Sequence, residues 1–186
     1  MEFVPRLVDL LDRAPARAGR TRVLAIDGPS GSGKTSLAGA LSTALDQAPV
    51  VHLDDLYPGW DGLAATVPRL VDGVLRPLAE GRPMGYRRYD WERGEDAEWI
   101  ELAAPGPVLI VEGAGAGARA GAPYLSVLAW LDAPAETRFA RAMARDGDTY
   151  RPHWQRWADQ ETRYFAENDP RGRADLRLYA QDPGVA

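Results

Sequence analysis

A glycine-rich stretch between an apolar run and a helix-like segment holds the residues with the clearest chemistry. It matches the phosphate-loop pattern of glycine, four residues, glycine, lysine, then serine or threonine, at Gly28, Gly33, Lys34 and Thr35. Glycines let the backbone curl so that successive N–H groups point into one concave space. The N-terminus of the following helix adds unpaired N–H groups and a partial positive charge. The spacing therefore predicts a site for the phosphates of a nucleotide.

The side chains of this loop have separate expected roles. Lys34, the only lysine in the chain, is placed to reach the β- and γ-phosphates, and the Thr35 hydroxyl is placed to hold Mg²⁺. We expect the nucleotide to contact Gly28, Ser30, Gly31, Ser32, Gly33, Lys34, Thr35 and Ser36. A flexible glycine loop that matches by chance is the alternative, and the position between a strand and a helix argues against it.

Acidic residues end two further apolar runs. Phosphoryl transfer to an alcohol needs a carboxylate that orients the acceptor hydroxyl and takes its proton. Asp54 fits this role, with Asp55 as the alternative. Glu112 follows four apolar residues in the form of a Walker B acid, so the candidate Mg²⁺ ligands are Thr35, Glu112 and Asp54. A strand-end turn or a helix cap is the structural alternative for these acids.

Arginines share one face of a predicted helix, because Arg138, Arg141 and Arg145 are spaced three and four residues apart. Together with Lys34 they are candidate catalytic residues, since arginines can clamp a transferring phosphoryl group and neutralise its charge. A solvated charged face is the alternative. We interpret residues 134–168 as a lid helix and the helix that follows it.

Aromatic side chains gather in predicted loops near the acidic edge. Exposed loop aromatics can stack on an acceptor ring, or they can close over a small hydrophobic cluster. The candidate acceptor-binding residues are Asp54, Tyr57, Trp60, Asp61, Tyr89, Trp91 and Arg93. An acceptor with its own carboxylate or phosphate would instead pair with Arg87, Arg88 or Arg93. Helical spacing predicts core packing for Trp154, Trp157, Glu161, Tyr164 and Phe165.

The elements that must position these residues alternate between strands and helices. We predict strands at residues 21–27, 49–53, 107–111, 125–131 and 174–179. We predict helices at residues 2–13, 34–45, 66–78, 134–145 and 152–168, a short helix near 95–102, and irregular structure over 82–94. This alternation implies right-handed crossovers and a parallel sheet, in which ligands bind beyond the carboxyl ends of the strands. Asp27, Asp54 and Glu112 are therefore expected at one edge.

The composition fits a single domain over residues 1–186, with 1–20 as N-terminal helix and linker and 54–104 as acceptor-binding region. A formal net charge of −5 argues against nucleic acid as a main partner. Without cysteine the chain has no disulfide or thiol nucleophile. No run is long and apolar enough to span a membrane, and the N-terminus is unlike a signal peptide, so we expect a cytoplasmic protein. Homo-oligomerisation stays open.

Taken together, these motifs resemble the P-loop kinases of small metabolites, and most of all the uridine/cytidine kinase family. Residues 28–35 look like that family's phosphate loop. The element Asp-Asp-Leu-Tyr at 54–57 is similar to its Asp-Ser-Phe-Tyr, in which the aspartate is the base and the tyrosine lines the nucleoside site. Trp60 and Asp61 stand where the family has an aromatic residue and a ribose-binding aspartate.

Further elements extend this resemblance over residues 21–179. Tyr-Asp-Trp at 89–91 is similar to the family's Tyr-Asp-Phe element near the base, and Arg145 matches the end of its arginine-bearing lid helix. The family has a histidine shortly after Tyr-Asp-Phe, where this chain has Arg93 and Gly94. The chain is also shorter, which implies a reduced acceptor-binding part.

The resemblance implies an α/β P-loop NTPase fold with a five-stranded parallel sheet, helices on both faces and a lid helix. It implies ATP and Mg²⁺ as cofactors and phosphoryl transfer to a hydroxyl of a small molecule, with a nucleoside favoured. An ATP-binding regulatory module without turnover is one alternative. A kinase for a vitamin, a sugar or a nucleotide is the other.

Overall fold

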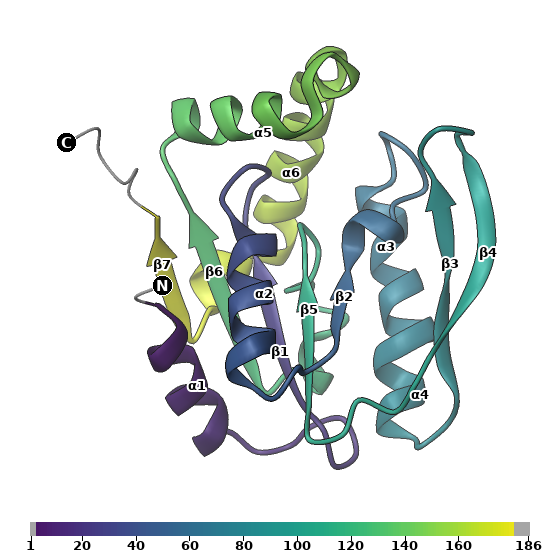
Figure 1. Cartoon of the computed structure of the whole chain (residues 1–186), viewed down its shortest axis with the longest axis vertical. Coiled ribbons are helices and arrows are strands. Elements are labelled where there is room, and N and C mark those ends of the chain that lie inside the picture. Colours follow the sequence, from purple (N-terminus) through teal and green to yellow (C-terminus); the bar gives the residue numbers. More distant parts are fainter. Residues whose placement is uncertain (1–2, 181–186) are drawn as a thin grey trace.

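A computed structural model describes residues 3–180 and shows a parallel sheet covered by helices (Figure 1). The sheet has five strands in the order β2-β5-β1-β6-β7. This confirms the predicted sheet and its strand number. The strands are β1 (Arg22–Asp27), β2 (Val50–His52), β5 (Val108–Glu112), β6 (Val127–Asp132) and β7 (Leu176–Tyr179).

Strand β1 runs through the centre of the sheet, and its side chains pack on both faces. Leu24 and Ile26 belong to the core beneath helices α1 (Phe3–Arg13) and α2 (Lys34–Ala44). Val23 and Ala25 belong to the core on the opposite face, which α3 (Leu63–Leu70) and α6 (Trp154–Asn168) cover. A strand buried on both sides reads as a continuous apolar run, which explains why the sequence located it so well.

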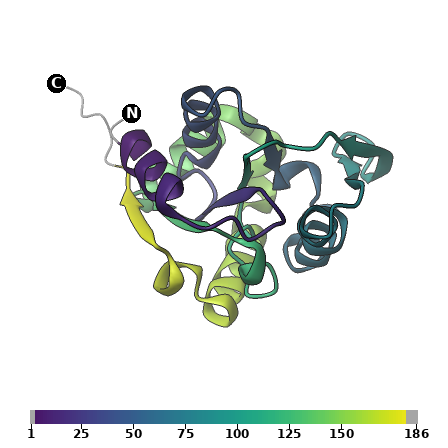
Figure 2. The ribbon, with the colours of Figure 1, turned by 90° about the horizontal axis from the view of Figure 1, so that it is seen from below.

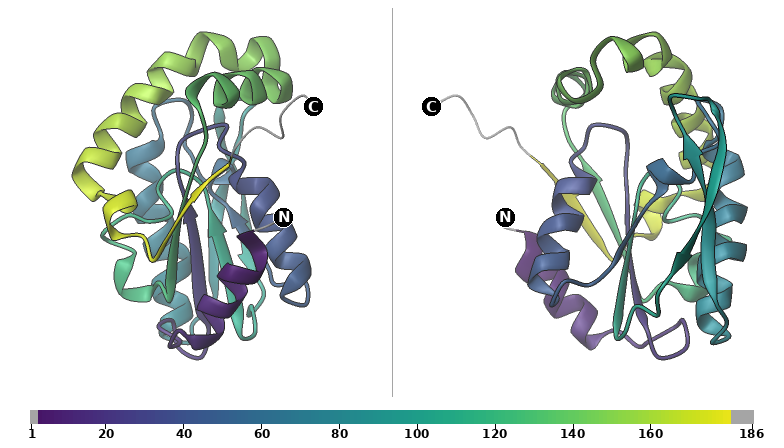
Figure 3. Two further views of the ribbon diagram at one scale, coloured as in Figure 1. Left: turned by 90° about the vertical axis from the view of Figure 1, so that its left-hand side faces the viewer. Right: turned by 45° about the vertical axis from the view of Figure 1, so that its right-hand side comes forward.

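The register of the sheet brings the acidic strand ends together. Glu112 pairs with His52 on one side and with Ile26 on the other, and Asp27 follows Ile26 directly. All of these strands are parallel, so their carboxyl ends share one edge. Figure 3 shows α5 (Ala135–Tyr150) and α6 arching over that edge. Two short helical segments adjoin this region: η1 (Leu53–Asp55) follows β2 directly, and η4 (Arg151–His153) joins α5 to α6.

The segment from residue 82 to 102 departs from the prediction. The irregular stretch and the short helix are wrong, because β3 (Met84–Asp90) and β4 (Glu95–Leu102) form an antiparallel hairpin. Ile100 and Leu102 alternate with exposed residues and pack against the core, which is the pattern of a half-buried strand. The hairpin is a separate two-stranded sheet. It lies beside the α3 and α4 (Arg76–Ala79) layer in Figure 2.

A close backbone approach explains how the hairpin sits on the helical layer. The helix predicted at 66–78 begins three residues earlier, at Leu63, and continues through a π-helical segment, η2 (Val71–Leu75), into α4. Gly73 lies in this π-helical segment, and a Cβ there would come within 2.4 Å of the Gly85 carbonyl oxygen of β3. The absence of a side chain therefore permits the contact between η2 and the hairpin.

The lid helix is interrupted at the glycine that the sequence predicted as its stop. Gly147, whose φ of 55° and ψ of −132° are not helical, divides α5 at a kink, and a second helical stretch continues to Tyr150. Such a conformation is accessible mainly to glycine. The remaining elements are η3 (Ala122–Tyr124) and α7 (Pro170–Arg173). Within residues 3–180, no helix is both long and apolar enough to cross a bilayer.

Two glycines give a matched test of this packing. A Cβ at Gly28, where φ is 149°, would lie 2.0 Å from the Leu131 carbonyl oxygen, whereas a Cβ at Gly39 in α2 would meet nothing within 4 Å. We expect Gly28→Ala to lower the free energy of unfolding by about 2–4 kcal/mol through overpacking. Gly39→Ala should raise it by roughly 0.5–1 kcal/mol, because alanine favours a helix. Urea unfolding measures both, and equal effects of the two changes would contradict this packing.

Candidate functional site

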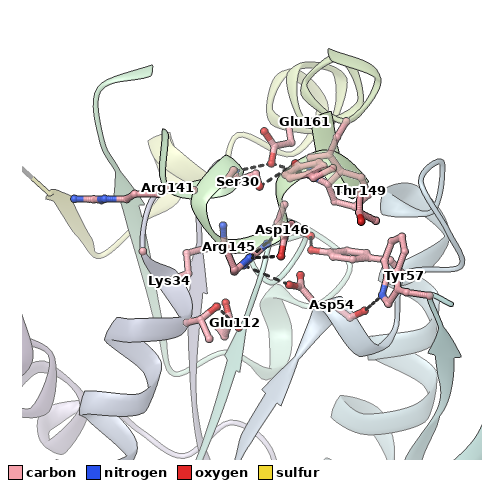
Figure 4. Close-up of a pocket in the computed structure, with 18 of the residues that line it drawn as sticks. Ser30, Lys34, Asp54, Tyr57, Glu112, Arg141, Arg145, Asp146, Thr149 and Glu161 are labelled. Atoms are coloured by element: carbon pink, nitrogen blue, oxygen red, sulfur yellow. Dashed lines mark hydrogen bonds and ion pairs between the residues drawn. The ribbon is translucent and has the colours of Figure 1, made fainter. Parts of the chain in front are cut away.

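A cavity of about 880 Å³ opens at the carboxyl edge of the sheet, beneath the lid helix (Figure 4). Its floor is the phosphate loop and the N-terminus of α2. Its walls come from the ends of β2 and β5, the loop after β2, and the underside of α5 and α6. The lining residues with charged or hydroxyl groups include Lys34, Thr35, Asp54, Glu112, Arg145 and Glu161.

The phosphate loop has the shape of an anion cradle. Gly33 caps α2 with a φ of 99°, so the N-terminus of this helix follows the loop directly. Lys34 Nζ donates hydrogen bonds to the carbonyl oxygens of Gly28 (2.8 Å) and Pro29 (2.9 Å). The Ser32 hydroxyl is buried without a hydrogen-bond partner. Ser32 and Gly28, two of the predicted nucleotide contacts, are not among the residues that line the cavity, whereas Lys34 is. The folded-back ammonium of Lys34 is therefore the side-chain group of this loop that fits the phosphates of a nucleotide.

The loop begins at a buried carboxylate that sequence reasoning placed at the edge without a role. Asp27 is fully buried and accepts hydrogen bonds from Gly28 N (2.7 Å), Gly117 N (2.8 Å) and the Tyr164 hydroxyl (2.6 Å). Burial raises the pKa of this carboxyl, and these hydrogen bonds oppose the rise. Asp27 therefore ties the phosphate loop to the loop after β5 and to α6.

The two predicted metal ligands at the centre of the edge are in contact. Glu112 Oε1 accepts a hydrogen bond from the Thr35 hydroxyl (3.1 Å) and lies 2.6 Å from Nδ1 of His52. Burial alone would raise the pKa of Glu112, but the His52 hydrogen bond and the charge of Lys34 hold it below its usual value. His52 was not predicted at this site, and only its position at the end of β2 pointed to it.

Thr35 and Glu112 are the groups that would hold Mg²⁺. Across residues 3–180, no group of three or more histidine or acidic side chains could hold a metal ion alone. This donor set suits Mg²⁺ in particular, because that ion keeps several waters and binds through one or two protein oxygens plus phosphates. Asp54, the third predicted ligand, lines the same cavity.

Asp54 and Asp55 differ in the groups that contact their carboxylates. Asp55 Oδ2 accepts a hydrogen bond from the Tyr86 hydroxyl at 3.2 Å. The Asp54 carboxylate faces the cavity, and its nearest cation is Arg145, with Nη1 3.9 Å from Oδ2. The Asp54 side chain is 58% exposed to the open cleft. The protein atoms that surround it there and the negative charge of Glu112 raise its pKa, and Arg145 opposes the rise. A carboxylate with this freedom and a raised pKa is suited to take a proton.

The predicted aromatic residues divide between the cavity and the surface around it. Tyr57, Trp60 and Trp91 line the cavity. The Tyr57 hydroxyl donates to the Ala114 carbonyl oxygen (2.8 Å), and Trp91 Nε1 donates to the Asp54 carbonyl oxygen (2.9 Å). Both rings therefore have fixed positions beside the acidic edge.

Trp60 joins the loop after β2 to the lid region. Its ring stacks on Tyr150, with centroids 5.2 Å apart and 15° between planes, and on His153, at 4.4 Å and 13°. Two aromatic rings of the chain are thus already stacked on Trp60. Trp60 contributes wall area at the mouth of the cavity.

Three predicted acceptor-binding residues lie outside the cavity lining. Asp61 forms an ion pair with Arg156 on the surface. Tyr89 packs edge-on against Trp91, with centroids 5.2 Å apart, and Arg93 is exposed at the hairpin turn. The sequence pattern placed these residues near the edge of the sheet but could not place their side chains. Their role in binding the acceptor stays a prediction.

The three predicted lid arginines lie in different environments. Arg141 and Arg145 line the cavity, whereas Arg138 does not. Arg138 instead donates to the carbonyl oxygens of Ala133 (3.1 Å) and Ser30 (3.4 Å). The first turn of α5 packs directly on the loop, since a Cβ at Gly31 would lie 2.2 Å from the Arg138 carbonyl oxygen. Arg138 is therefore occupied in joining α5 to the loop.

Glu161 is the cavity residue that sequence reasoning assigned only to the core. It is buried, as predicted, with 4% of its surface exposed, and it also lines the cavity. Its Oε1 accepts hydrogen bonds from Ser30 N (2.7 Å) and Trp157 Nε1 (3.0 Å). Burial raises the pKa of its carboxyl to about 7, against the opposing charges of Lys34 and Arg138. In the sequence, the only feature that pointed to this role is a charged residue at a helical position that was predicted to be buried.

Glu161 should make stability depend on pH in one direction. Its pKa is about 7 in the folded protein against an ordinary value of 4.5, so folding favours the protonated form. The contribution to stability is therefore complete below about pH 4.5 and is lost as the pH rises through about 7. The shift corresponds to roughly 3 kcal/mol. We expect Glu161→Gln to gain stability relative to wild type over this range in urea denaturation, and a pH-independent difference would contradict this assignment.

Comparisons with known proteins place the fold. No family model matches the chain, and neither does any curated protein sequence. A possible uridine kinase from Bacillus stearothermophilus is 25% identical with a TM-score of 0.65, over 96% of this chain and 100% of that one. A candidate fructose transport system kinase from Silicibacter sp. TM1040 is 20% identical with a TM-score of 0.58, over 95% and 97%. By its fold, its phosphate loop and the first of these likenesses, the chain is a P-loop small-molecule kinase that resembles uridine kinase.

Proposed function

We propose that this kinase transfers the γ-phosphoryl group of ATP, with Mg²⁺, to a hydroxyl group of a small molecule, and that a nucleoside is the favoured acceptor. The observation that carries the proposal is the common cavity. It contains the phosphate loop with Lys34, the Thr35–Glu112 pair, and the carboxylate of Asp54 beside Arg145. A switch module needs the first two features but has no use for a free carboxylate next to a lid arginine.

Each of these residues has a task in the transfer. Bound ATP would supply the phosphoryl group, and Mg²⁺ would neutralise charge on its oxygens. Asp54 orients the acceptor hydroxyl and takes its proton, since its carboxylate faces the cavity. Lys34 can turn its ammonium from the loop carbonyls to the phosphates, and Arg145 stabilises negative charge near Asp54. The lid excludes water that would otherwise accept the phosphoryl group.

The walls of the cavity support a neutral acceptor with a ring. Tyr57, Trp60 and Trp91 supply apolar surface next to Asp54. Two of the three hairpin arginines that would attract an anionic acceptor are engaged elsewhere, since Arg88 pairs with Glu98 (2.7 Å) and Arg87 donates to the Ala97 carbonyl oxygen (3.1 Å). The third, Arg93, lies outside the cavity lining. The likeness to a possible uridine kinase favours a nucleoside among neutral acceptors.

The test is acceptor-dependent release of ADP. Nucleosides, sugars, vitamins and nucleotides are supplied separately with ATP and Mg²⁺, and ADP is measured against ATP alone. Turnover with nucleosides supports the proposal, and turnover with another group reassigns the acceptor. Tight binding of ATP without turnover for any acceptor would favour a regulatory module. Thermal shift with an ATP analogue shows binding independently, because a ligand of the folded state stabilises it.

Neighbouring aspartates provide a test of the base. We expect Asp54→Asn to lower kcat by about 10²- to 10⁴-fold, the usual effect of losing a positioned base. The KM for ATP should change little, because the carboxylate faces the acceptor side of the cavity. Asp55→Asn is the matched control, since Asp55 holds the Tyr86 hydroxyl. Steady-state kinetics of both variants decide the matter. If Asp55→Asn alone is damaging, the base is Asp55.

A further inference from the structure

The peptide unit between Pro29 and Ser30 in the phosphate loop is held at both of its ends. Its carbonyl oxygen, that of Pro29, accepts a hydrogen bond from Lys34 Nζ at 2.9 Å. Its N–H, that of Ser30, donates to Glu161 Oε1 at 2.7 Å. A trans peptide is a rigid plane with its C=O and N–H on opposite sides. Fixing the N–H direction therefore also fixes the direction of the carbonyl.

We propose that Glu161 is a positioning residue for phosphoryl transfer. It holds the Ser30 N–H so that the Pro29 carbonyl faces Lys34 and keeps the ammonium at the entrance of the phosphate site. Rotation of this peptide would turn the carbonyl away from Lys34 and direct an N–H at the ammonium instead. Glu161 thus acts through the peptide and through Lys34, without contact to the transferred group.

The position of Glu161 is itself well determined. The same oxygen that accepts from Ser30 also accepts from Trp157 Nε1, one helical turn earlier in α6. Trp157 is 5% exposed and packs edge-on against Tyr57, with ring centroids 4.7 Å apart. The carboxylate is therefore held by a packed helix and a buried indole, as a group needs to be if it is to orient another.

Other groups of the lid region hold the same serine. The Tyr150 hydroxyl donates to Ser30 Oγ at 2.9 Å, and Arg138 Nη1 donates to the Ser30 carbonyl oxygen at 3.4 Å. Backbone N–H, backbone carbonyl and side chain of Ser30 are all engaged by residues between 138 and 161. The contact with Glu161 is the one that reaches Lys34 through a single peptide plane.

Two conservative changes separate the geometry of Glu161 from its charge. Glu161→Gln retains an acceptor oxygen at the same distance along the side chain and removes the charge. Glu161→Asp retains the charge but draws the oxygen back by one methylene, away from Ser30. The control is Glu167→Asp, on the same helix with its side chain exposed. Because Lys34 is the only lysine, a ¹⁵N-lysine label gives one side-chain ammonium signal that reports on it directly.

We expect Glu161→Asp to shift or broaden the Lys34 ammonium signal in the nucleotide-free protein. It should also weaken binding of a non-hydrolysable ATP analogue by about tenfold, the effect of losing one hydrogen bond to a charged group. Glu161→Gln should leave the signal in place and bind within about threefold of wild type, and Glu167→Asp should match wild type. If Glu161→Gln is the more damaging change, or if the Lys34 signal and binding are unchanged in both, the positioning role is overturned.

These readouts are independent of the acceptor. The inference rests on the proposed function only in that the loop binds a nucleotide. The ammonium signal is measured without any ligand, and analogue binding needs no acceptor. The test of Glu161 can therefore be interpreted even if no acceptor is found. Tyr150→Phe adds a check, because it removes a Ser30 contact that does not involve the Pro29–Ser30 peptide, and it should leave the Lys34 signal unchanged.

Discussion

The buried carboxylate of Asp27 is the interaction on which the arrangement of the site depends. It receives the N–H of Gly28 at the start of the phosphate loop, the N–H of Gly117 in the loop after β5, and the Tyr164 hydroxyl of α6. A buried carboxylate is unfavourable unless its oxygens are satisfied, so these three segments must meet at one point. The phosphate loop is thereby fixed relative to the strand end that carries Glu112 and to the helix that carries Glu161.

Negative charge dominates the edge that a nucleotide would occupy. Asp54, Glu112 and Glu161 line the cavity around one lysine, and Arg141 and Arg145 approach from α5. Burial raises the pKa of Glu161, and the surrounding protein atoms together with the charge of Glu112 raise that of Asp54, whereas the hydrogen bond from His52 and the charge of Lys34 help to keep the pKa of Glu112 low. Such a site favours phosphates only together with cations. This accounts for the combination of a hydroxyl–carboxylate pair suited to Mg²⁺ with a lid that carries arginine.

The lid region is joined to the rest of the molecule by aromatic stacking as well as hydrogen bonds. Trp60 lies against Tyr150 and His153, and Tyr150 also reaches Ser30. The kink at Gly147 lies between the arginine-bearing part of α5 and these contacts. The loop after β2, the phosphate loop and the lid therefore meet on the same few side chains. If one of these three segments moves, the other two must adjust. The acceptor side of the cavity is thereby connected with the nucleotide side.

The sequence alone determined the phosphate loop, the five-stranded parallel sheet and the acidic strand ends, because these follow from local spacing and from continuous apolar runs. It did not reveal the β3–β4 hairpin, because residues 95–102 become a strand only by pairing with β3, and β3 in turn packs on η2 through the close approach of Gly73 and Gly85. Nor did it separate Arg138, which contacts the phosphate loop, from Arg141 and Arg145, which line the cavity, although the three share a helix face. Glu161 and His52 lie far from the loop in sequence, and only the folded chain decided that one holds Ser30 and the other Glu112. Those contacts depend on how helices and strands pack, which no short stretch of sequence encodes.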